Sequence, residues 1–194
     1  MVWTRVRRLP QTGAMHDKPL LASPPQTCCN FVRRVPDGDT MERYVCAACG
    51  NVHYVNPKIV VGSVCSWDGR ILLCRRAIEP RRGFWTIPAG YLEEHETPVD
   101  GAKREAREEA CAEIEIDALL AVYSVARISQ VQLIYRATLH VPEFSPGIES
   151  LEAKLVSWDE IPWHDLAFPS VHWALNHHRA VDGQHRFAPF ANPA

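Results

Sequence analysis

Glu105, Glu108 and Glu109 stand close together in the middle of the chain. They fall within residues 98–112, where small or apolar side chains recur every three or four positions, which predicts an amphipathic helix. At about 100° per residue, the three carboxylates share one arc of that helix. Anions in the last turns of a helix are disfavoured by about 0.3–1 kcal/mol each, so a bound cation would stabilise them. Their hard oxygen atoms suit Mg²⁺ or Mn²⁺.

A solvated helix face with salt bridges is the alternative interpretation of the same residues. Arg104 can pair with Glu108 at i,i+4, and Lys103 and Arg107 dilute the negative charge. The helix alone therefore leaves both a cation site and an ion-paired surface open.

The elements that must position these glutamates follow from patterns on either side. Thr97 is a candidate N-cap and Pro98 fits the first helical position, so we expect a helix over Pro98–Ala112. Asp68-Gly69 between two aliphatic runs predicts a β-hairpin. Strands outnumber helices, so the helices must cover a mixed sheet in an α/β fold. The expected strands are 58–67, 70–75, 114–125, 130–141 and 153–158, and a closing helix is expected over 164–180.

The stretch from Gly90 to Ala112, GYLEEHETPVDGAKREAREEACA, resembles the Nudix box. That pattern is Gly, five residues, Glu, seven residues, Arg-Glu, a small apolar residue, any residue, and Glu-Glu. Cys111 departs from it, because the family usually has Gly after the helix, and this puts the helix-terminating turn in doubt more than the metal site. The residues on the pattern are Gly90, Glu96, Arg104, Glu105, Ala106, Glu108 and Glu109.

The resemblance extends beyond the box. Trp85 and Pro88-Ala89-Gly90 look like the family's loop entering the helix, and residues 58–167 have the layout of a Nudix domain. The fold implied is an α/β/α sandwich around a mixed sheet. We therefore expect a disordered tail over residues 1–27, a zinc-ribbon-like segment over 28–57, the Nudix domain over 58–167, and a C-terminal helix and tail over 168–194.

Carried over residue by residue, the resemblance implies that Glu105, Glu108 and Glu109 hold the metal ions. The backbone carbonyl of Gly90 or Ala89 would add a ligand, and Glu96 would pair with Arg104 to brace the loop. Glu152 resembles the extra acid that many members bring from a distant loop, with an ordinary surface glutamate as the alternative. These carboxylates would hold the ions on a pyrophosphate, and one of Glu105, Glu108 and Glu152 would take the proton of the attacking water.

Arginines before Trp85 are candidates for holding phosphates through bidentate contacts. Arg75, Arg76, Arg81 and Arg82 flank this loop, and surface arginines beside a strand are the plain alternative. We expect Arg76, Arg82 and Trp85 to contribute to substrate binding.

The sequence Cys46-Ala-Ala-Cys49-Gly50 is half of a tetrahedral zinc site. The other half is irregular, since only the adjacent Cys28 and Cys29 precede it. The region is similar to the N-terminal zinc ribbon of a Nudix subfamily that includes NADH, FAD and ADP-ribose pyrophosphatases. That similarity implies Zn²⁺ on Cys46, Cys49 and one or both of Cys28 and Cys29, with His53 as a further candidate. A fold without metal, or reduced and inert cysteines, is the alternative.

Composition excludes some classes of protein. With 194 residues and a net charge of −2, the chain is not held to nucleic acid or anionic lipid by bulk charge. Its apolar stretches fall short of the roughly 20 residues of a membrane helix. Seven cysteines without a secretory segment fit a reducing compartment, so we expect a cytoplasmic protein. Arg5, Arg7 and Arg8 with no acid before Asp17 also fit an organelle-targeting peptide, but a disordered tail, or Met15 as the true first residue, is the favoured interpretation.

These observations predict a Mg²⁺- or Mn²⁺-dependent pyrophosphohydrolase. It would act on a nucleoside diphosphate derivative of ADP-ribose, FAD or NADH type and release a nucleoside monophosphate and a phosphorylated partner. Only Phe168-Pro169-Ser170 remains of a longer signature found in NADH pyrophosphatases, which makes NADH less favoured. Related ribbon-bearing members suggest a homodimer. The alternatives are a ligand-sensing Nudix module without turnover and a zinc-ribbon protein that binds nucleic acid.

Overall fold

The computed structural model describes residues 30–193, and the chain divides into two compact units, Met1–Val55 and Asn56–Ala194. The expected tail over residues 1–27 lies outside the described residues, as do Cys28 and Cys29 at the start of the ribbon-like segment.

The described part of the first unit, residues 30–55, contains a small antiparallel sheet of β1 (Phe31–Arg34), β2 (Arg43–Cys46) and β3 (Val52–His53), in the order β1-β2-β3. After β2 the chain turns sharply, and the Gly50 N–H donates to the Cys46 carbonyl at 2.9 Å. Gly50 has φ +74°, a conformation that favours glycine. The Cys-x-x-Cys-Gly segment is therefore a tight turn at the end of β2.

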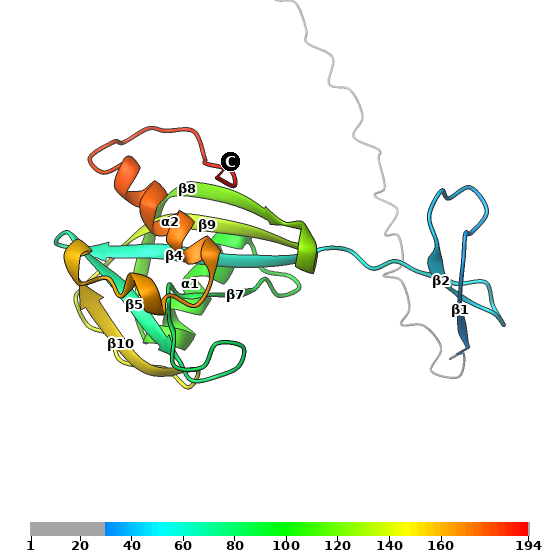
Figure 1. Ribbon diagram of the computed structural model, residues 1–194, viewed down its shortest axis with the longest axis horizontal. Coiled ribbons are helices and arrows are strands. Elements are labelled where there is room, and N and C mark those ends of the chain that lie inside the picture. Colours follow the sequence, from blue (N-terminus) through cyan, green and yellow to red (C-terminus); the bar gives the residue numbers. More distant parts are fainter. Residues whose placement is uncertain (1–29, 194) are drawn as a thin grey trace, which may run out of the picture. The chain divides into compact units, whose positions relative to one another are not determined.

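The second unit is built on one mixed sheet in the order β10-β5-β4-β9-β8, where β4 and β9 are parallel and the other pairs are antiparallel (Figure 1). Short strands β6 and β7 pair with β5 and β4. The expected mixed sheet is confirmed. Its strands are β4 (Lys58–Trp67), β5 (Arg70–Arg76), β6 (Trp85–Thr86), β7 (Ala89–Tyr91), β8 (Ile114–Val125), β9 (Gln130–Leu139) and β10 (Ser150–Val156).

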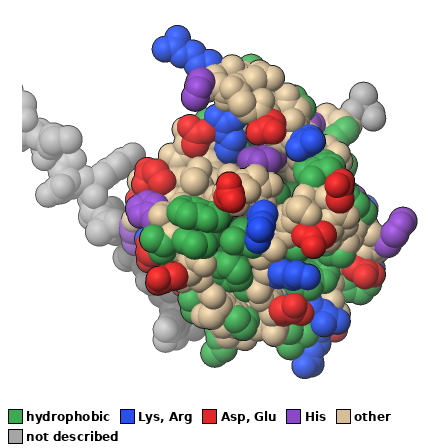
Figure 2. All heavy atoms as spheres, turned by 90° about the vertical axis from the view of Figure 1, so that its left-hand side faces the viewer, with side chains coloured by type: hydrophobic (Ala, Val, Ile, Leu, Met, Phe, Trp, Pro, Cys, Tyr) green, Lys and Arg blue, Asp and Glu red, His purple; other side chains and the backbone are tan. Residues whose placement is uncertain are grey.

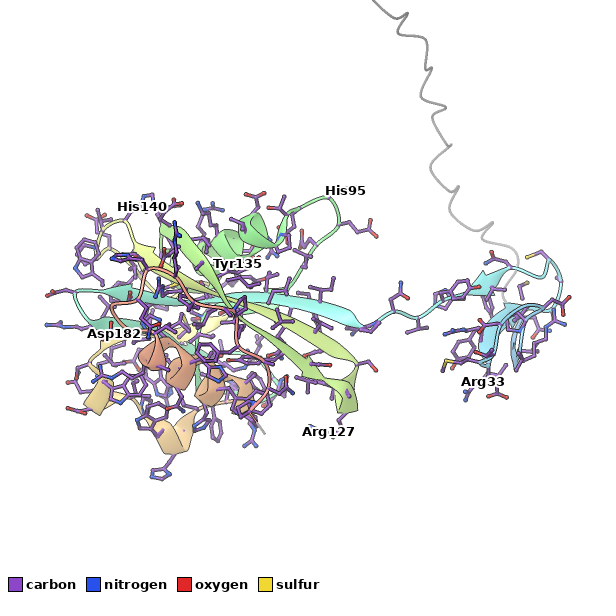
Figure 3. All side chains as sticks on the ribbon, turned by 90° about the horizontal axis from the view of Figure 1, so that it is seen from above. Arg33, His95, Arg127, Tyr135, His140 and Asp182 are labelled. Carbon is purple, nitrogen blue, oxygen red and sulfur yellow. The ribbon has the colours of Figure 1, made fainter. Side chains whose placement is uncertain are left out.

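Helices α1 (Pro98–Ala110) and α2 (Pro169–Ala180) cover opposite faces of this sheet, which Figure 3 shows edge-on. The small side chains of Ala102, Ala106 and Ala110 are completely buried, so α1 packs closely on the sheet. On the other face Ala174 and Leu175 of α2 belong to a cluster with Leu73, Leu120 and Tyr123 of the sheet. The layers form the expected sandwich.

Element boundaries differ from the expectations where backbone chemistry intervenes. Helix α1 starts at Pro98 as expected, and the Thr97 side chain accepts a hydrogen bond from the Asp100 N–H at 3.2 Å. It ends at Ala110, because Cys111 takes the left-handed conformation with φ 47°. The turn that the missing glycine put in doubt therefore forms with a cysteine.

The last expected elements also shift. The closing helix begins at Pro169 instead of residue 164, because the residue before a proline favours an extended backbone. Residues Trp163–Asp165 form a separate 3₁₀ turn, η3. The expected strand over 153–158 runs over Ser150–Val156, and the strand expected to reach residue 141 ends at Leu139. Hydrogen bonding to neighbouring strands sets these ends, which single-strand patterns do not show.

The surface carries no single-sign field on the face shown in Figure 2, where Lys and Arg side chains are interspersed with Asp and Glu. Within residues 30–193 no helix is both long and apolar enough to span a bilayer.

Candidate active site

Two of the three box glutamates are buried. Glu105 and Glu109 keep only 7% and 5% of their surface, because they border the alanine seam by which α1 packs on the sheet. The Glu109 carboxylate accepts a hydrogen bond from the Ala89 N–H at 3.1 Å. Glu108 lies on the same arc but its side chain is 55% exposed. The helix therefore presents a buried acidic pair with a third carboxylate at its rim.

Strand β7 brings Gly90 against this pair. A Cβ built on Gly90 would lie 2.5 Å from Glu105 Oε2 and 2.6 Å from its Cδ, far inside van der Waals contact. Glycine at this position therefore lets the Glu105 carboxylate lie directly against the backbone of β7. The carbonyl groups of Ala89 and Gly90 belong to this strand, which contacts both buried carboxylates through the Ala89 N–H and Gly90.

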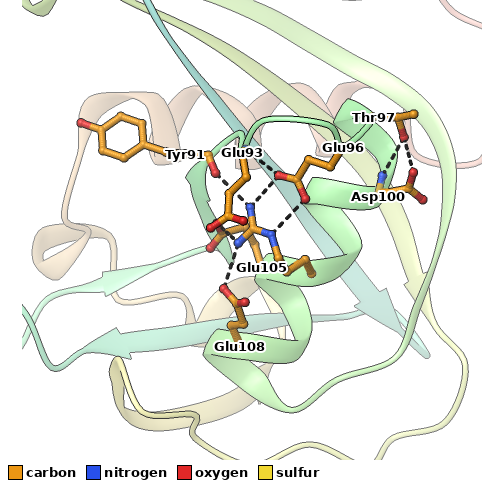
Figure 4. Close-up of polar contacts among 8 residues, drawn as sticks. Tyr91, Glu93, Glu96, Thr97, Asp100, Glu105 and Glu108 are labelled. Carbon is orange, nitrogen blue, oxygen red and sulfur yellow. Dashed lines mark hydrogen bonds and ion pairs between the residues drawn. The ribbon is translucent and has the colours of Figure 1, made fainter. Parts of the chain in front are cut away.

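Arg104 ties the box together through five hydrogen bonds (Figure 4). Its Nε and Nη2 donate to the two oxygens of Glu96 at 3.0 and 2.8 Å. Its Nη1 donates to Glu105 Oε1 at 2.8 Å and to Glu108 Oε2 at 2.9 Å, and its Nη2 also reaches the Tyr91 carbonyl. The structure thus contains both the brace with Glu96 and the i,i+4 pair with Glu108 that the sequence suggested.

The pKa of Glu96 is lowered, whereas the pKa values of the buried Glu105 and Glu109 are raised. The Arg104 guanidinium, helped by the Glu93 N–H, lowers the pKa of Glu96 to about 2. Burial raises the pKa of Glu109 to about 8, and the nearby charges of Glu105 and Glu149 add to the rise. Burial likewise raises the pKa of Glu105, against the pull of Arg104. The buried pair is thus held in a site that favours an added positive charge.

The residues of this site fit a hard divalent cation. Burial destabilises the charged forms of Glu105 and Glu109, and strand β7 lies directly against Glu105 at Gly90. Glu108 adds a third carboxylate at the exposed edge of the site. Among the residues that the structure describes, no three His, Cys, Asp or Glu side chains already converge as a ligand set. Glu105 and Glu108 instead point to Arg104, and Glu109 points to the Ala89 amide.

A second distant-loop acid, Glu149, joins Glu152 as a candidate. The charge of Glu149 contributes to the raised pKa values of both Glu105 and Glu109. Glu152 lies within β10, where it is opposite Arg75 and its Oε2 is 4.0 Å from Arg75 Nη1. Sequence reasoning missed Glu149; the neighbouring Pro146-Gly147 turn was the available signal.

The arginines before Trp85 have different surroundings. Arg76 faces the site, since its charge lowers the pKa of Glu109 and its guanidinium lies 5.2 Å from the centre of the Phe168 ring. Its Nε donates to the Pro80 carbonyl at 2.9 Å, which fixes the side chain on the 77–83 loop. Arg82 is exposed on that loop. Trp85 packs against the core, and its carbonyl accepts from the Ala167 N–H at 2.8 Å.

A pocket of about 340 Å³ lies between the 77–83 loop and the start of α2. It is shallow and open to solvent, and it combines aromatic, apolar and basic side chains. Sequence reasoning noted several of these residues without joining them into one pocket. The lining residues are Arg81, Leu166, Ala167, Phe168, Pro169, His172 and Trp173.

The cysteine knuckle is partly described. Cys46 is buried at 1% exposure and Cys49 is exposed, three positions on in the tight turn after β2. Their proposed partners, Cys28 and Cys29, lie outside the described residues. The geometry therefore leaves zinc binding as a prediction.

Comparison with known proteins places this architecture. The NUDIX domain model matches residues 56–177, and the Nudix N-terminal model matches residues 27–55. The crystal structure of a NUDIX hydrolase from Nitrosomonas europaea is 47% identical, with a TM-score of 0.79, over 84% of this chain and 94% of that one.

Curated relatives agree with this match. A MutT-like protein from Streptomyces ambofaciens is 35% identical over 65% of this chain and 84% of its own length. An ADP-ribose pyrophosphatase from Methanocaldococcus jannaschii is 28% identical over 59% of this chain and 69% of its own length. With the NUDIX model covering more than half of the sequence, and the acidic helix, the Arg104 brace and Gly90 in place, the chain belongs to the Nudix hydrolase family.

Proposed function

We propose that the protein hydrolyses the pyrophosphate bond of a nucleoside diphosphate derivative, with Mg²⁺ or Mn²⁺, to a nucleoside monophosphate and a phosphorylated partner. The observation that carries the proposal is the buried pair of Glu105 and Glu109 against Gly90, with Arg76 close enough to act on Glu109. Such a site pairs cation-binding carboxylates with a basic group for phosphate.

We further propose that Glu105, Glu108, Glu109 and the carbonyl of Gly90 or Ala89 hold the cation. A divalent cation there would neutralise the charge of the phosphate oxygens and make water more acidic. The chain's own residues do the rest. Arg104 fixes the direction of Glu105 and Glu108, and the Ala89 amide fixes Glu109. These contacts hold the three carboxylates before a cation binds.

A carboxylate must also take the proton of the attacking water. We propose that the distant-loop acid does this, with Glu149 favoured over Glu152. Glu149 acts on the buried pair, whereas Glu152 is held beside Arg75. Replacing each by glutamine separates them: kcat falls by about 10²-fold or more for the base, whereas the other variant keeps most of its activity.

Arg76 and the adjacent pocket support the choice of substrate class. The Arg76 guanidinium faces the acidic pair on one side and the Phe168 ring on the other, so a diphosphate bound at the acids places its attached group near Phe168. Aromatic Phe168 and Trp173, with Arg81 and His172, suit a ribosyl or nucleoside group. The named ADP-ribose pyrophosphatase among the relatives makes ADP-ribose the first substrate to test.

The test is release of monophosphate from ADP-ribose, FAD, NADH, a diadenosine polyphosphate and nucleoside triphosphates, each with Mg²⁺, Mn²⁺ or EDTA. We expect metal-dependent cleavage of a dinucleotide-type substrate, ADP-ribose foremost. Glu109→Gln should lose at least about 10²-fold in kcat, whereas Glu113→Gln, just beyond the helix and exposed, is the matched control.

Two results would redirect the proposal. Binding of ADP-ribose by the folded, metal-loaded protein without any cleavage would favour the ligand-sensing module. If the Glu109→Gln variant cleaved every substrate as fast as the wild type, the buried pair would have no role in the reaction.

A further inference from the structure

The 140–149 segment between β9 and β10 caps the carboxyl end of α1. The Ser145 N–H donates to the Ala110 carbonyl at 2.9 Å, and the Gly147 N–H donates to the Glu109 carbonyl at 3.0 Å. The last carbonyls of a helix lack partners within the helix, so these two bonds satisfy groups that would otherwise need water. Pro146, which has no N–H, stands between the two donors. The loop is thus bonded through its backbone to the helix that carries the acidic site.

Gly147 makes the closest part of this contact. A Cβ built on Gly147 would collide with the carbonyl oxygen of Glu108, and it would lie 2.8 Å from that carbonyl's carbon and 3.2 Å from the Glu109 carbonyl carbon. These atoms are helix backbone, so they cannot swing aside as a flexible side chain would. The absence of a side chain at residue 147 therefore sets how closely the loop approaches α1.

The same loop fixes Glu149 on both sides. The Ser150 N–H donates to the Gly147 carbonyl at 3.0 Å, and the Glu149 carbonyl accepts from the Ala77 N–H at 2.8 Å. Between Gly147 and Glu149, Ile148 is 93% exposed and points away from the protein. The Glu149 charge contributes to the raised pKa values of Glu105 and Glu109. The backbone bonds of Gly147 and Ala77 therefore fix the main chain from which the Glu149 side chain extends.

We propose that Gly147 is a positioning residue, whose close approach to the Glu108 carbonyl holds the 140–149 loop on α1 and sets the Glu149 carboxylate against Glu105 and Glu109. A methyl group at residue 147 would lift the loop and withdraw that carboxylate. The kinetic consequence rests on the proposed pyrophosphohydrolase function, whereas the docking of the loop does not.

The kinetic test compares Gly147→Ala, Glu149→Gln and the double variant with ADP-ribose and Mg²⁺. Both single variants should lose about 10²-fold in kcat with KM changed less than about threefold, and the double variant should be no slower than Glu149→Gln alone. Ile148→Ala is the matched control within the loop, because the Ile148 side chain is 93% exposed, and it should keep the wild-type kcat.

Three results would overturn the proposal: wild-type kcat in Gly147→Ala, wild-type kcat in Glu149→Gln, or losses that multiply in the double variant. The last would mean that Gly147 acts on α1 without involving Glu149.

Hydrogen exchange on the wild-type protein tests the loop if Gly147→Ala does not fold. The amides of Ser145 and Gly147 should be protected as strongly as those of Cys111 and Ala112, which bond within the end of α1. Exchange of Ser145 and Gly147 at loop rates, with Cys111 and Ala112 protected, would refute the docking. If the wild type cleaves no pyrophosphate compound, the proposed function fails and this exchange pattern alone decides whether the loop is held.

Discussion

The raised pKa of Glu109 makes the stability of the metal-free protein depend on pH. An ordinary glutamate has a pKa of 4.5, and burial raises the value for Glu109 to about 8. Because the folded state holds this proton more tightly than the unfolded state, the contribution of Glu109 to stability is complete below pH 4.5 and is lost as pH rises toward 8. At about 1.4 kcal/mol per pKa unit, the shift corresponds to a loss of about 3–5 kcal/mol between pH 5 and pH 8.

Urea unfolding in EDTA at pH 5, 6, 7 and 8 measures this loss, with Glu109→Gln as the comparison. Glutamine cannot ionise, so the free energy of unfolding of the wild type should fall relative to the variant by about 1 kcal/mol or more per pH unit. Added Mg²⁺ should reduce the slope in the wild type alone, since cation binding favours the charged carboxylate. Parallel pH profiles of the two proteins in EDTA would refute the assignment of Glu109 as a buried, destabilised acid.

Three further predictions concern single sites. Gly90→Ala should lower kcat by about 10²-fold, because the added Cβ would lie 2.5 Å from Glu105 Oε2 and would displace the Glu105 carboxylate. Mg²⁺-dependent turnover measures this effect, and an unchanged rate would contradict it. Cys111→Gly should raise stability by about 0.5–1 kcal/mol, seen as a Tm increase of a few degrees, because glycine adopts the left-handed conformation at φ 47° without strain; a lower Tm would count against this. Cys46→Ser should lower Tm and abolish Zn²⁺ in elemental analysis if the ribbon binds zinc, whereas an unchanged Tm in a zinc-free protein would discard the ribbon site.

Local sequence patterns predict most of helix α1 and of the segments next to it. Thr97 and Pro98 mark the start of α1, and the spacing of Glu96 and Arg104 anticipates their ion pair, because capping and box chemistry act over a few residues. The hairpin at Asp68-Gly69 is local in the same way, and both residues have the positive φ that such turns require.

The rest of the site depends on contacts between distant segments. Glu149 and Glu152 are three positions apart, and the structure distinguishes them by their surroundings: the charge of Glu149 raises the pKa of Glu105 and Glu109, whereas Glu152 lies beside Arg75. The bonds that hold this loop on α1 come from the main-chain groups of Ser145 and Gly147, and because every residue has such groups, residue type signals them weakly. The same holds for the pocket, whose walls come from the 77–83 loop and the start of α2.

The parallel pairing of β4 with β9 has a consequence for folding. Lys58 pairs with Gln130 and Ser66 pairs with Thr138. The central strand β4 therefore pairs with a strand that lies about 70 residues later in the chain. Such non-local contacts slow folding, because a long loop must close before they contribute any stability. A growing chain can form the β4–β5 hairpin and α1 early, yet the sheet on which α1 packs is completed only when β9 has emerged. We therefore expect the acidic site to assemble late, in the same cooperative step that completes the sheet.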